Sequence, residues 1–270
     1  MNQVMAGKKI GFIGAGVMGA ALIKSLLDSS IKSDQIYISE KNIERAKEVV
    51  YKYQVKNSST TDIAKSCDVI FLAVKPQDLE STLKDLSSNL NQDSLIISIA
   101  AGKTTNFIEG KLKSKNSVIR VMPNTPTQIG RGVSVISSGS NSNKDDINLT
   151  KALLENTGLV VEVDEAQQDA VTALSGSGPA YFFAFVEAMV NSGVSLGLST
   201  DTATKLTIGT ISGSAAMLAE SGLDASTLRK NVTSPNGTTA AALEVFNANK
   251  LDEIIHMAMA AAKKRSQELA

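Results

Sequence analysis

The sequence has very few of the residues on which several protein classes depend. Its 270 residues include one cysteine, Cys67, one histidine, His256, and no tryptophan. Disulfide frameworks, thiolate or histidine metal clusters and histidine-based catalytic triads all require more of these residues. We therefore expect no bound metal and a buried, unreactive Cys67. For His256 we favour a solvated position on a late helix over a role as a catalytic base.

The charge balance and the lack of long apolar runs exclude further classes. Lysine plus arginine and aspartate plus glutamate number 27 each, so no net charge favours a nucleic acid or an anionic membrane as partner. No stretch reaches the roughly 18 apolar residues of a membrane-spanning helix. The beginning of the chain shows no apolar run of signal-peptide length. We predict a cytoplasmic protein without membrane or nucleic-acid partners.

The first part of the chain alternates strand and helix patterns. Short β-branched runs predict strands from KIGFIG, at residues 9–14, to GLVVEV, at residues 158–163. Most of them are apolar on both faces, which is typical of a parallel sheet with helices on each side. Helical patterns separate them at residues 17–28, 42–51, 77–89 and 145–156. This alternation predicts an α/β Rossmann-type doubly wound domain over residues 1–164.

The second part, residues 165–270, contains helical patterns only and predicts a separate all-α domain. The expected helices cover residues 167–174, 179–196, 200–220, 225–232, 238–247 and 250–268.

Two of these helices have unusual compositions. The segment 179–196 is apolar on nearly every side, which predicts burial all round. The segment 200–220 contains Gly209 and Gly213 on one face, and an interior glycine costs a helix roughly 1 kcal/mol relative to alanine. Close packing must compensate, either in a seam within the chain or at a subunit interface.

A glycine-rich turn follows the first predicted strand and opens the first predicted helix. Gly14, Gly16 and Gly19 have the G-x-G-x-x-G spacing, which allows a tight turn, close approach of a pyrophosphate and helix–strand packing. The pyrophosphate then lies on the helix N-terminal amides. The dinucleotide contacts expected on this turn are Gly14, Ala15, Gly16, Val17, Met18 and Gly19.

The end of the second predicted strand bears on the choice between NAD and NADP. Glu40 lies at the position, about 20 residues past the last glycine, where an acid accepts hydrogen bonds from the ribose 2′-hydroxyl. Lys41 and Arg45 follow and favour a 2′-phosphate instead. A one-residue error in the strand end would bring Ser39 to this position. Both cofactors remain open.

Four further segments resemble one known family. FLAVKPQ at 71–77, RVMPNTP at 120–126, LSGSGPAYFF at 174–183 and LRKNVTSPNGTTAAAL at 228–243 are similar to segments of the pyrroline-5-carboxylate reductases, in the same order. The resemblance implies NAD(P)H-dependent reduction of Δ1-pyrroline-5-carboxylate to L-proline, the last step of proline biosynthesis. It implies that residues 165–270 form a dimerisation and substrate-binding domain. It further implies a homodimer through that domain, or a larger homo-oligomer such as a decamer.

The resemblance also assigns roles to residues. It makes Thr239 the catalytic residue that meets the substrate nitrogen, and Ser234 the residue that meets the carboxylate. The implied substrate contacts are Ser234, Asn236, Gly237, Thr238 and Thr239. The implied cofactor contacts beyond the glycine turn are Ser39, Glu40, Lys41, Ala73, Val74, Lys75, Pro76, Ala100 and Asn124.

The loop SPNGTT, at residues 234–239, carries hydroxyls and backbone amides but no ionisable side chain. We expect free amides of Asn236, Gly237 and Thr238 to hold a carboxylate at a helix start. Asn236 replaces the family's usual glycine and tolerates a left-handed backbone better than other side chains. The alternative is that Thr238 or Thr239 is a simple N-cap.

Two other activities share this plan. A β-hydroxyacid dehydrogenase needs a lysine and an asparagine where this chain has Phe182 and Phe185. This chain therefore lacks the lysine that serves as acid and base in that family. A non-catalytic dinucleotide sensor would not need so specialised a loop. For Lys75, we favour a structural and cofactor-contact role over proton donation.

Overall fold

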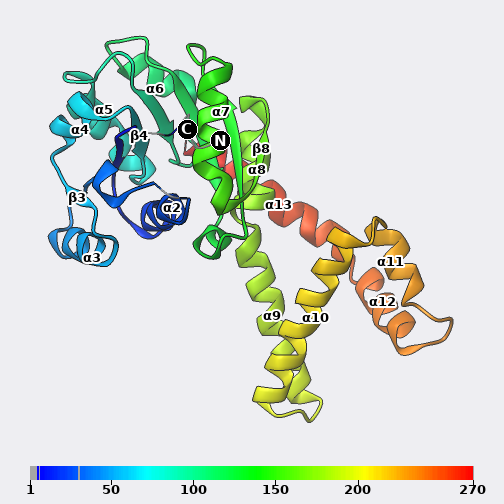
Figure 1. The fold of residues 1–270 in the computed structure, drawn as a ribbon. Helices are drawn as coiled ribbons and strands as arrows, with labels where there is room; N and C mark the ends of the chain where they lie inside the picture. Colours follow the sequence, from blue (N-terminus) through cyan, green and yellow to red (C-terminus); the bar gives the residue numbers. More distant parts are fainter. Residues whose placement is uncertain (1–4, 6, 30, 270) are drawn as a thin grey trace. The chain divides into compact units, whose positions relative to one another are not determined.

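The computed structural model describes residue 5, residues 7–29 and residues 31–269, which form two compact units (Figure 1). The first unit comprises Met1–Ser177 and Ala261–Ala270, and the second comprises Gly178–Ala260. The first unit thus continues past residue 164, and the domain boundary expected there stays a prediction.

An eight-stranded sheet forms the centre of the first unit, in the order β3-β2-β1-β4-β5-β6-β7-β8. The strands are β1 Ile10–Ile13, β2 Ile36–Ser39, β3 Lys56–Asn57, β4 Val69–Leu72, β5 Leu95–Ser98, β6 Val118–Pro123, β7 Gly132–Ser138 and β8 Gly158–Glu162. Neighbouring strands are parallel except β6 and β7, which pair antiparallel. The strand order reverses beside β1, where doubly wound folds bind their ligands. The predicted Rossmann-type fold class is confirmed.

The helices of the first unit follow the strands in the chain. They are α2 Val17–Asp28, α3 Ile43–Tyr53, α4 Thr60–Ser66, α5 Leu79–Ser87, α6 Thr105–Lys111, α7 Lys144–Leu154 and α8 Gln168–Val171. Short 3₁₀ turns cover Ser33–Gln35, Pro76–Asp78, Thr125–Ile129, Glu155–Thr157 and Glu165–Gln167, and a π-helical turn covers Thr172–Gly176. The sequence patterns missed α4 and α6, which have seven residues each.

Apolar side chains fill two buried clusters in the first unit. In one of them the rings of Phe12 and Phe71, from adjacent strands, stack with centroids 4.6 Å apart. Cys67 is fully buried in the other, and this burial raises the pKa of its thiol to about 11. The thiol is therefore protonated at neutral pH. The predicted burial of Cys67 is confirmed, and its lack of reactivity stays a prediction.

The last residues of the chain contact the first unit at Asp169, a partner of the buried Arg120, and at Gly102. Arg120, on β6, pairs with Glu165 at 3.5 Å and with Asp169 at 3.8 Å, and its side chain is 4% exposed. The Ser266 hydroxyl, near the chain end, donates to Asp169 at 2.7 Å. A Cβ on Gly102 would lie 2.8 Å from the Leu269 Cβ, so the last helical turn packs closely on the loop after β5.

The second unit is helical. Its elements are α9 Gly178–Ser195, α10 Thr200–Glu220, α11 Ala225–Asn231, α12 Thr238–Ala248 and the first part of α13 Leu251–Glu268. The helices α9 and α10 pack side by side as a hairpin (Figure 1). Within the described residues, every helix is too short or too polar to cross a membrane.

The expected burial of α9 is wrong for a single chain. Phe182 and Phe183 are 64% and 62% exposed. A Cβ on Gly209 or Gly213 of α10 would meet no atom of the described residues within 4 Å, so the seam within the chain is also wrong. The reason is that no described segment covers these helix faces, which leaves a subunit interface as the alternative.

Candidate functional site

The turn between β1 and α2 requires its glycines for different reasons. Gly14 has a φ of +91°, and a Cβ there would lie 2.6 Å from the Ala73 carbonyl oxygen. A Cβ on Gly19 would lie 2.8 Å from the Gly14 carbonyl oxygen. A Cβ on Gly16 would meet nothing within 4 Å. Gly14 and Gly19 are therefore required by the fold, whereas Gly16 keeps the space in front of the helix open.

The N-terminus of α2 has the properties of an anion site. Its N-cap, Gly16, makes no side-chain capping bond, and the first turn contains no acidic residue. The first helical amides therefore meet no side-chain cap, and the helix dipole adds a partial positive charge. These features, together with the open space at Gly16, fit the pyrophosphate of a dinucleotide.

A cavity of about 500 Å³ opens at the ends of β1, β2 and β4 beside this turn. Eight of the sequence-predicted cofactor residues line it: Gly14, Gly16, Ser39, Glu40, Lys41, Ala73, Val74 and Lys75. Sequence reasoning assigned no cofactor role to several other lining residues, among them Asn42, Thr60, Asp78, Thr82 and Asp85. Thr60 and Thr82 were missed because they lie on α4 and α5, and only the packing of these helices brings them to the strand ends.

The other predicted cofactor residues lie outside this cavity. They are Ala15, Val17, Met18, Gly19, Pro76, Ala100 and Asn124. Ala15, Gly19 and Ala100 are buried, whereas Val17 is 59% exposed. Their contact with the cofactor stays a prediction.

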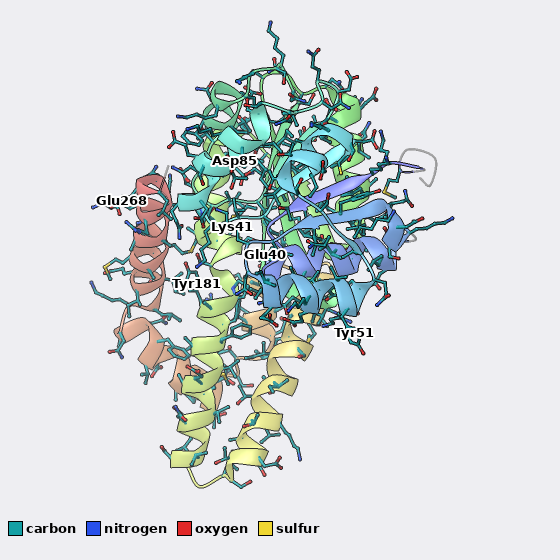
Figure 2. All side chains as sticks on the ribbon, turned by 90° about the vertical axis from the view of Figure 1, so that its left-hand side faces the viewer. Glu40, Lys41, Tyr51, Asp85, Tyr181 and Glu268 are labelled. Carbon is teal, nitrogen blue, oxygen red and sulfur yellow. The ribbon has the colours of Figure 1, made fainter. Side chains whose placement is uncertain are left out.

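The end of β2 is defined by hydrogen bonds. Ser39 is the last residue of the strand, and its hydroxyl lies 3.0 Å from that of Thr60. Glu40 follows directly and accepts hydrogen bonds from two backbone amides, Ala15 at 2.8 Å and Asn42 at 2.9 Å. Figure 2 labels Glu40 and Lys41 beside each other after this strand. Glu40 thus joins the glycine turn to the start of α3.

Asn124 links two other segments of the first unit. Its side-chain oxygen accepts from the Val133 amide at 2.8 Å, and its amide nitrogen donates to the Ser175 carbonyl at 3.3 Å. Asn124 is 8% exposed. Its side chain therefore holds the end of β6 to β7 and to the π-helical turn that contains Ser175.

The loop before α12 forms a tight turn. Asn236 has a φ of +56°, so the expectation of a left-handed backbone at this residue is confirmed. The Gly237 amide donates to the Ser234 carbonyl at 3.0 Å, and a Cβ on Gly237 would lie 3.1 Å from that oxygen. The expectation of a free Gly237 amide is therefore wrong, because the turn itself uses this donor.

The start of α12 remains an open set of donors. Its N-cap is Gly237, with no side-chain capping bond, and Thr238 and Thr239 are the first two helical residues. The N-cap alternative for these threonines is wrong. The amides of Thr238, Thr239 and Ala240 therefore begin the helix without a side-chain acceptor, as an anion site requires.

His256 is the remaining candidate for a catalytic base, since the loop at residues 234–239 has no ionisable side chain. His256 lies exposed on α13, as expected. Among the residues that the structure describes, no group of three or more histidine, cysteine, aspartate or glutamate side chains is arranged to hold a metal ion.

Comparison with family models gives two matches along the chain. Residues 165–269 match the model described as pyrroline-5-carboxylate reductase dimerisation. Residues 9–102 match the model described as NADP oxidoreductase, coenzyme F420-dependent. The first match covers the helical part of the chain, and the second covers the glycine turn and the cavity beside it.

Individual proteins resemble the chain over nearly its whole length. The pyrroline-5-carboxylate reductase of Pseudomonas aeruginosa is 39% identical over 98% of this chain and 98% of its own. The solved structure of the Coxiella burnetii enzyme has a TM-score of 0.90 at 34% identity, covering 97% of this chain and 98% of that one. The NADP-bound Plasmodium falciparum pyrroline carboxylate reductase has a TM-score of 0.87 at 32% identity, with the same coverage.

Proposed function

The chain belongs to the pyrroline-5-carboxylate reductase family, and we propose how its own residues perform that family's reaction. It is an oxidoreductase that reduces Δ1-pyrroline-5-carboxylate to L-proline with NAD(P)H. The observation that carries this conclusion is 39% identity along 98% of the chain, which spans both the glycine turn and the loop before α12. The residue roles below are the proposed part.

The first unit binds the cofactor in this proposal. NAD(P)H supplies the hydride when it is bound. The amides that begin α2 hold the pyrophosphate, and Gly16 admits it because no Cβ fills the approach. Ala73, Val74 and Lys75, at the end of β4, line the same cavity. Lys75 is exposed there and acts as a cofactor contact.

The second unit binds the substrate carboxylate in this proposal. The open amides of Thr238, Thr239 and Ala240 begin α12, and a helix start favours an anion by about 0.3–1 kcal/mol, more when partly buried. The Ser234 hydroxyl adds a donor beside them. The Gly237 amide contributes indirectly, because its bond to the Ser234 carbonyl fixes the turn that presents these donors.

Thr239 orients the imine in this proposal. Its hydroxyl donates to or accepts from the substrate nitrogen, which can take its proton from water before binding. The protein therefore needs no strong acid, in agreement with a loop that has no ionisable side chain. Ordering the hydride donor and the acceptor supplies much of the remaining rate enhancement, by several kcal/mol.

The chain carries a family dimerisation region, and we assign the dimer contact to the second unit. Exposed apolar side chains support this assignment, among them Phe182, Phe183, Ile208 and Ile254. Sedimentation would distinguish the homodimer from a larger assembly such as a decamer. A cytoplasmic location stays a prediction from the sequence.

A spectrophotometric assay tests the function. Purified protein, NADPH or NADH, and Δ1-pyrroline-5-carboxylate should lose absorbance at the nicotinamide band, with proline as product. Binding of the dinucleotide without turnover would support the sensor alternative and contradict the assignment.

A further inference from the structure

The cavity beside the glycine turn contains features that bear on the choice between the two nicotinamide cofactors. NADPH differs from NADH by one phosphate on the adenosine 2′-oxygen. A protein that prefers NADH offers a carboxylate to the ribose 2′-hydroxyl, whereas one that prefers NADPH offers cations to the phosphate. The loop after β2 and the first turn of α3 contain both kinds of side chain, Glu40 on the one hand and Lys41 and Arg45 on the other.

Both oxygens of the Glu40 carboxylate already accept a hydrogen bond. Oε2 accepts from the Ala15 amide at 2.8 Å, and Oε1 accepts from the Asn42 amide at 2.9 Å. The two donors lie on the glycine turn and at the N-cap of α3, respectively. Hydrogen bonds from backbone amides to a carboxylate are charge-assisted and among the stronger ones. Glu40 therefore has a structural task within the fold, since it ties the cofactor turn to the loop beside it.

The two cations beside Glu40, Lys41 of the loop and Arg45 of α3, are available. Lys41 is exposed and makes no hydrogen bond or ion pair with any residue that the structure describes. The Arg45 side chain pairs with Glu48 at 3.5 Å on the surface of α3, and this is its one ion pair among the described residues. Such exposed pairs contribute little, about 0–1 kcal/mol, so a phosphate dianion competes effectively for the guanidinium. Both side chains line the cavity.

The acidic groups that share the cavity come from a different segment. Asp78 and Asp85 belong to the 3₁₀ turn and to α5, after β4. Glu40 is thus the carboxylate of the loop after β2 that lines the cavity, and each of its oxygens accepts one backbone amide. Lys41 of this loop and Arg45 of α3 offer a 2′-phosphate two cations, whereas the one lining carboxylate of the loop already serves as an acceptor for backbone amides.

We propose that this chain selects NADPH, with Lys41 and Arg45 as the residues that bind the 2′-phosphate and Glu40 as a positioning residue that holds the glycine turn. The proposal rests on the proposed function, since it concerns the cofactor of that reaction. It departs from the sequence-based hypothesis that Glu40 binds the ribose.

The test compares two adenosine nucleotides that differ only in this phosphate. Calorimetric titration of the full-length protein with adenosine 2′,5′-bisphosphate and with 5′-AMP measures binding without turnover. We expect the bisphosphate to bind at least about tenfold more tightly, the ratio that one charge-assisted contact supplies. Equal affinities overturn the proposal. Failure of both nucleotides to bind contradicts the proposed function itself.

Single substitutions then test which residues bind the 2′-phosphate. Lys41→Ala and Arg45→Ala should each weaken the bisphosphate about tenfold and leave 5′-AMP unchanged. Lys47→Ala is the matched control, because Lys47 is exposed on the same helix, pairs with Glu44 and lies outside the cavity. An equal loss for Lys47→Ala, or no loss for the other two, overturns the assignment.

Glu40→Gln separates positioning from recognition. A glutamine retains the length of the side chain but can accept only one of the two amide bonds. We expect both nucleotides to weaken by a similar factor, so that their affinity ratio stays constant. A selective loss of 5′-AMP affinity, with the bisphosphate unchanged or tighter, means that Glu40 binds the ribose and overturns the proposal.

Discussion

The two units of this chain differ in how far a single chain buries their large apolar side chains. Phe71, in the first unit, is completely buried and stacks on Phe12, whereas Phe182, in the second, is 64% exposed. A buried large side chain contributes about 1.5–3 kcal/mol of transfer free energy, and an exposed one contributes little until something covers it. The first unit is therefore complete within one chain. The second leaves large apolar side chains exposed in the single chain, in agreement with the dimerisation family model that matches it.

The largest expected effect comes from the core of the first unit. Phe71→Ala should lower the free energy of unfolding by about 3–5 kcal/mol, because it removes a buried ring and leaves a cavity. Urea unfolding at several protein concentrations measures this. Phe182→Ala is the matched change in the second unit, and its effect should fade on dilution. If Phe71→Ala lowers the free energy of unfolding less than Phe182→Ala does in dilute protein, the contrast between the two units is wrong.

A charge on the exposed face of the second unit should come next. Ile208, on α10, is 53% exposed in the single chain. Ile208→Asp would bury an unpaired carboxylate at the interface and should weaken self-association at least about a hundredfold, ~2.7 kcal/mol. Sedimentation velocity reports the mass. Tyr51→Asp, at an 85% exposed position on α3, is the control that should change nothing. An unaltered mass for Ile208→Asp would exclude this face from the interface.

The chemistry assigned to the second unit predicts a smaller but measurable effect. Thr239→Ala should reduce kcat/KM by about tenfold, ~1.4 kcal/mol, if its hydroxyl helps in the transition state. Steady-state kinetics measures the loss, and Thr239→Ser should restore most of the rate because it retains the hydroxyl. Full activity in the alanine variant would remove Thr239 from the reaction.

The anion sites that we propose for the two units differ in one donor. The start of α2 offers backbone amides alone, whereas in the proposal the start of α12 also has the Ser234 hydroxyl as a donor. Ser234→Ala should raise KM for the substrate about fivefold, ~1 kcal/mol, and leave KM for NADPH unchanged. A substrate KM equal to that of the wild type would mean that amides alone hold the carboxylate.

The smallest expected effect is a difference in pH dependence between two exposed carboxyl groups. Backbone and side-chain hydrogen bonds from Thr227 lower the pKa of Asp224, the N-cap of α11. The Lys111 ammonium lowers the pKa of Glu80 in the first unit. Each carboxylate therefore stabilises the fold above its unfolded pKa, about 4, and this contribution is lost as the pH falls through the folded value.

Thermal unfolding of Asp224→Asn and Glu80→Gln across this range measures both contributions. Each stability difference from the wild type should shrink towards pH 3. High salt should reduce the Glu80 difference more, because that pair depends on an exposed charge partner. A difference that persists unchanged at pH 3 would contradict the assignment for that residue.

Local patterns predicted much of the fold. The β-branched runs and helical periodicities located every long element, and α10 begins and ends where the sequence pattern does. The short helices α4 and α6 were missed because seven residues are too few for a helical period to emerge. The antiparallel direction of β7 was also not predicted, because apolar content alone does not encode strand direction.

The candidate site was predicted less completely than the fold. The glycine turn and Asn236 follow from backbone rules that act on single residues. Thr60, Thr82 and Asp85 line the cavity only because α4 and α5 pack beside the strand ends. No pattern at those positions indicates a ligand, so sequence reasoning had no signal for them.

The sequence by itself therefore determined the order of the long elements, the residues of the glycine turn and the chemical character of the loop before α12. These depend on local conformational preferences, which a short stretch of chain contains in full. Only the tertiary structure decided that Glu40 serves two backbone amides and that the Gly237 amide is used within its own turn. It also decided that the faces of α9 and α10 stay open. A hydrogen-bond donor or an apolar face finds its partner through packing, and packing is a property of the folded chain rather than of any segment.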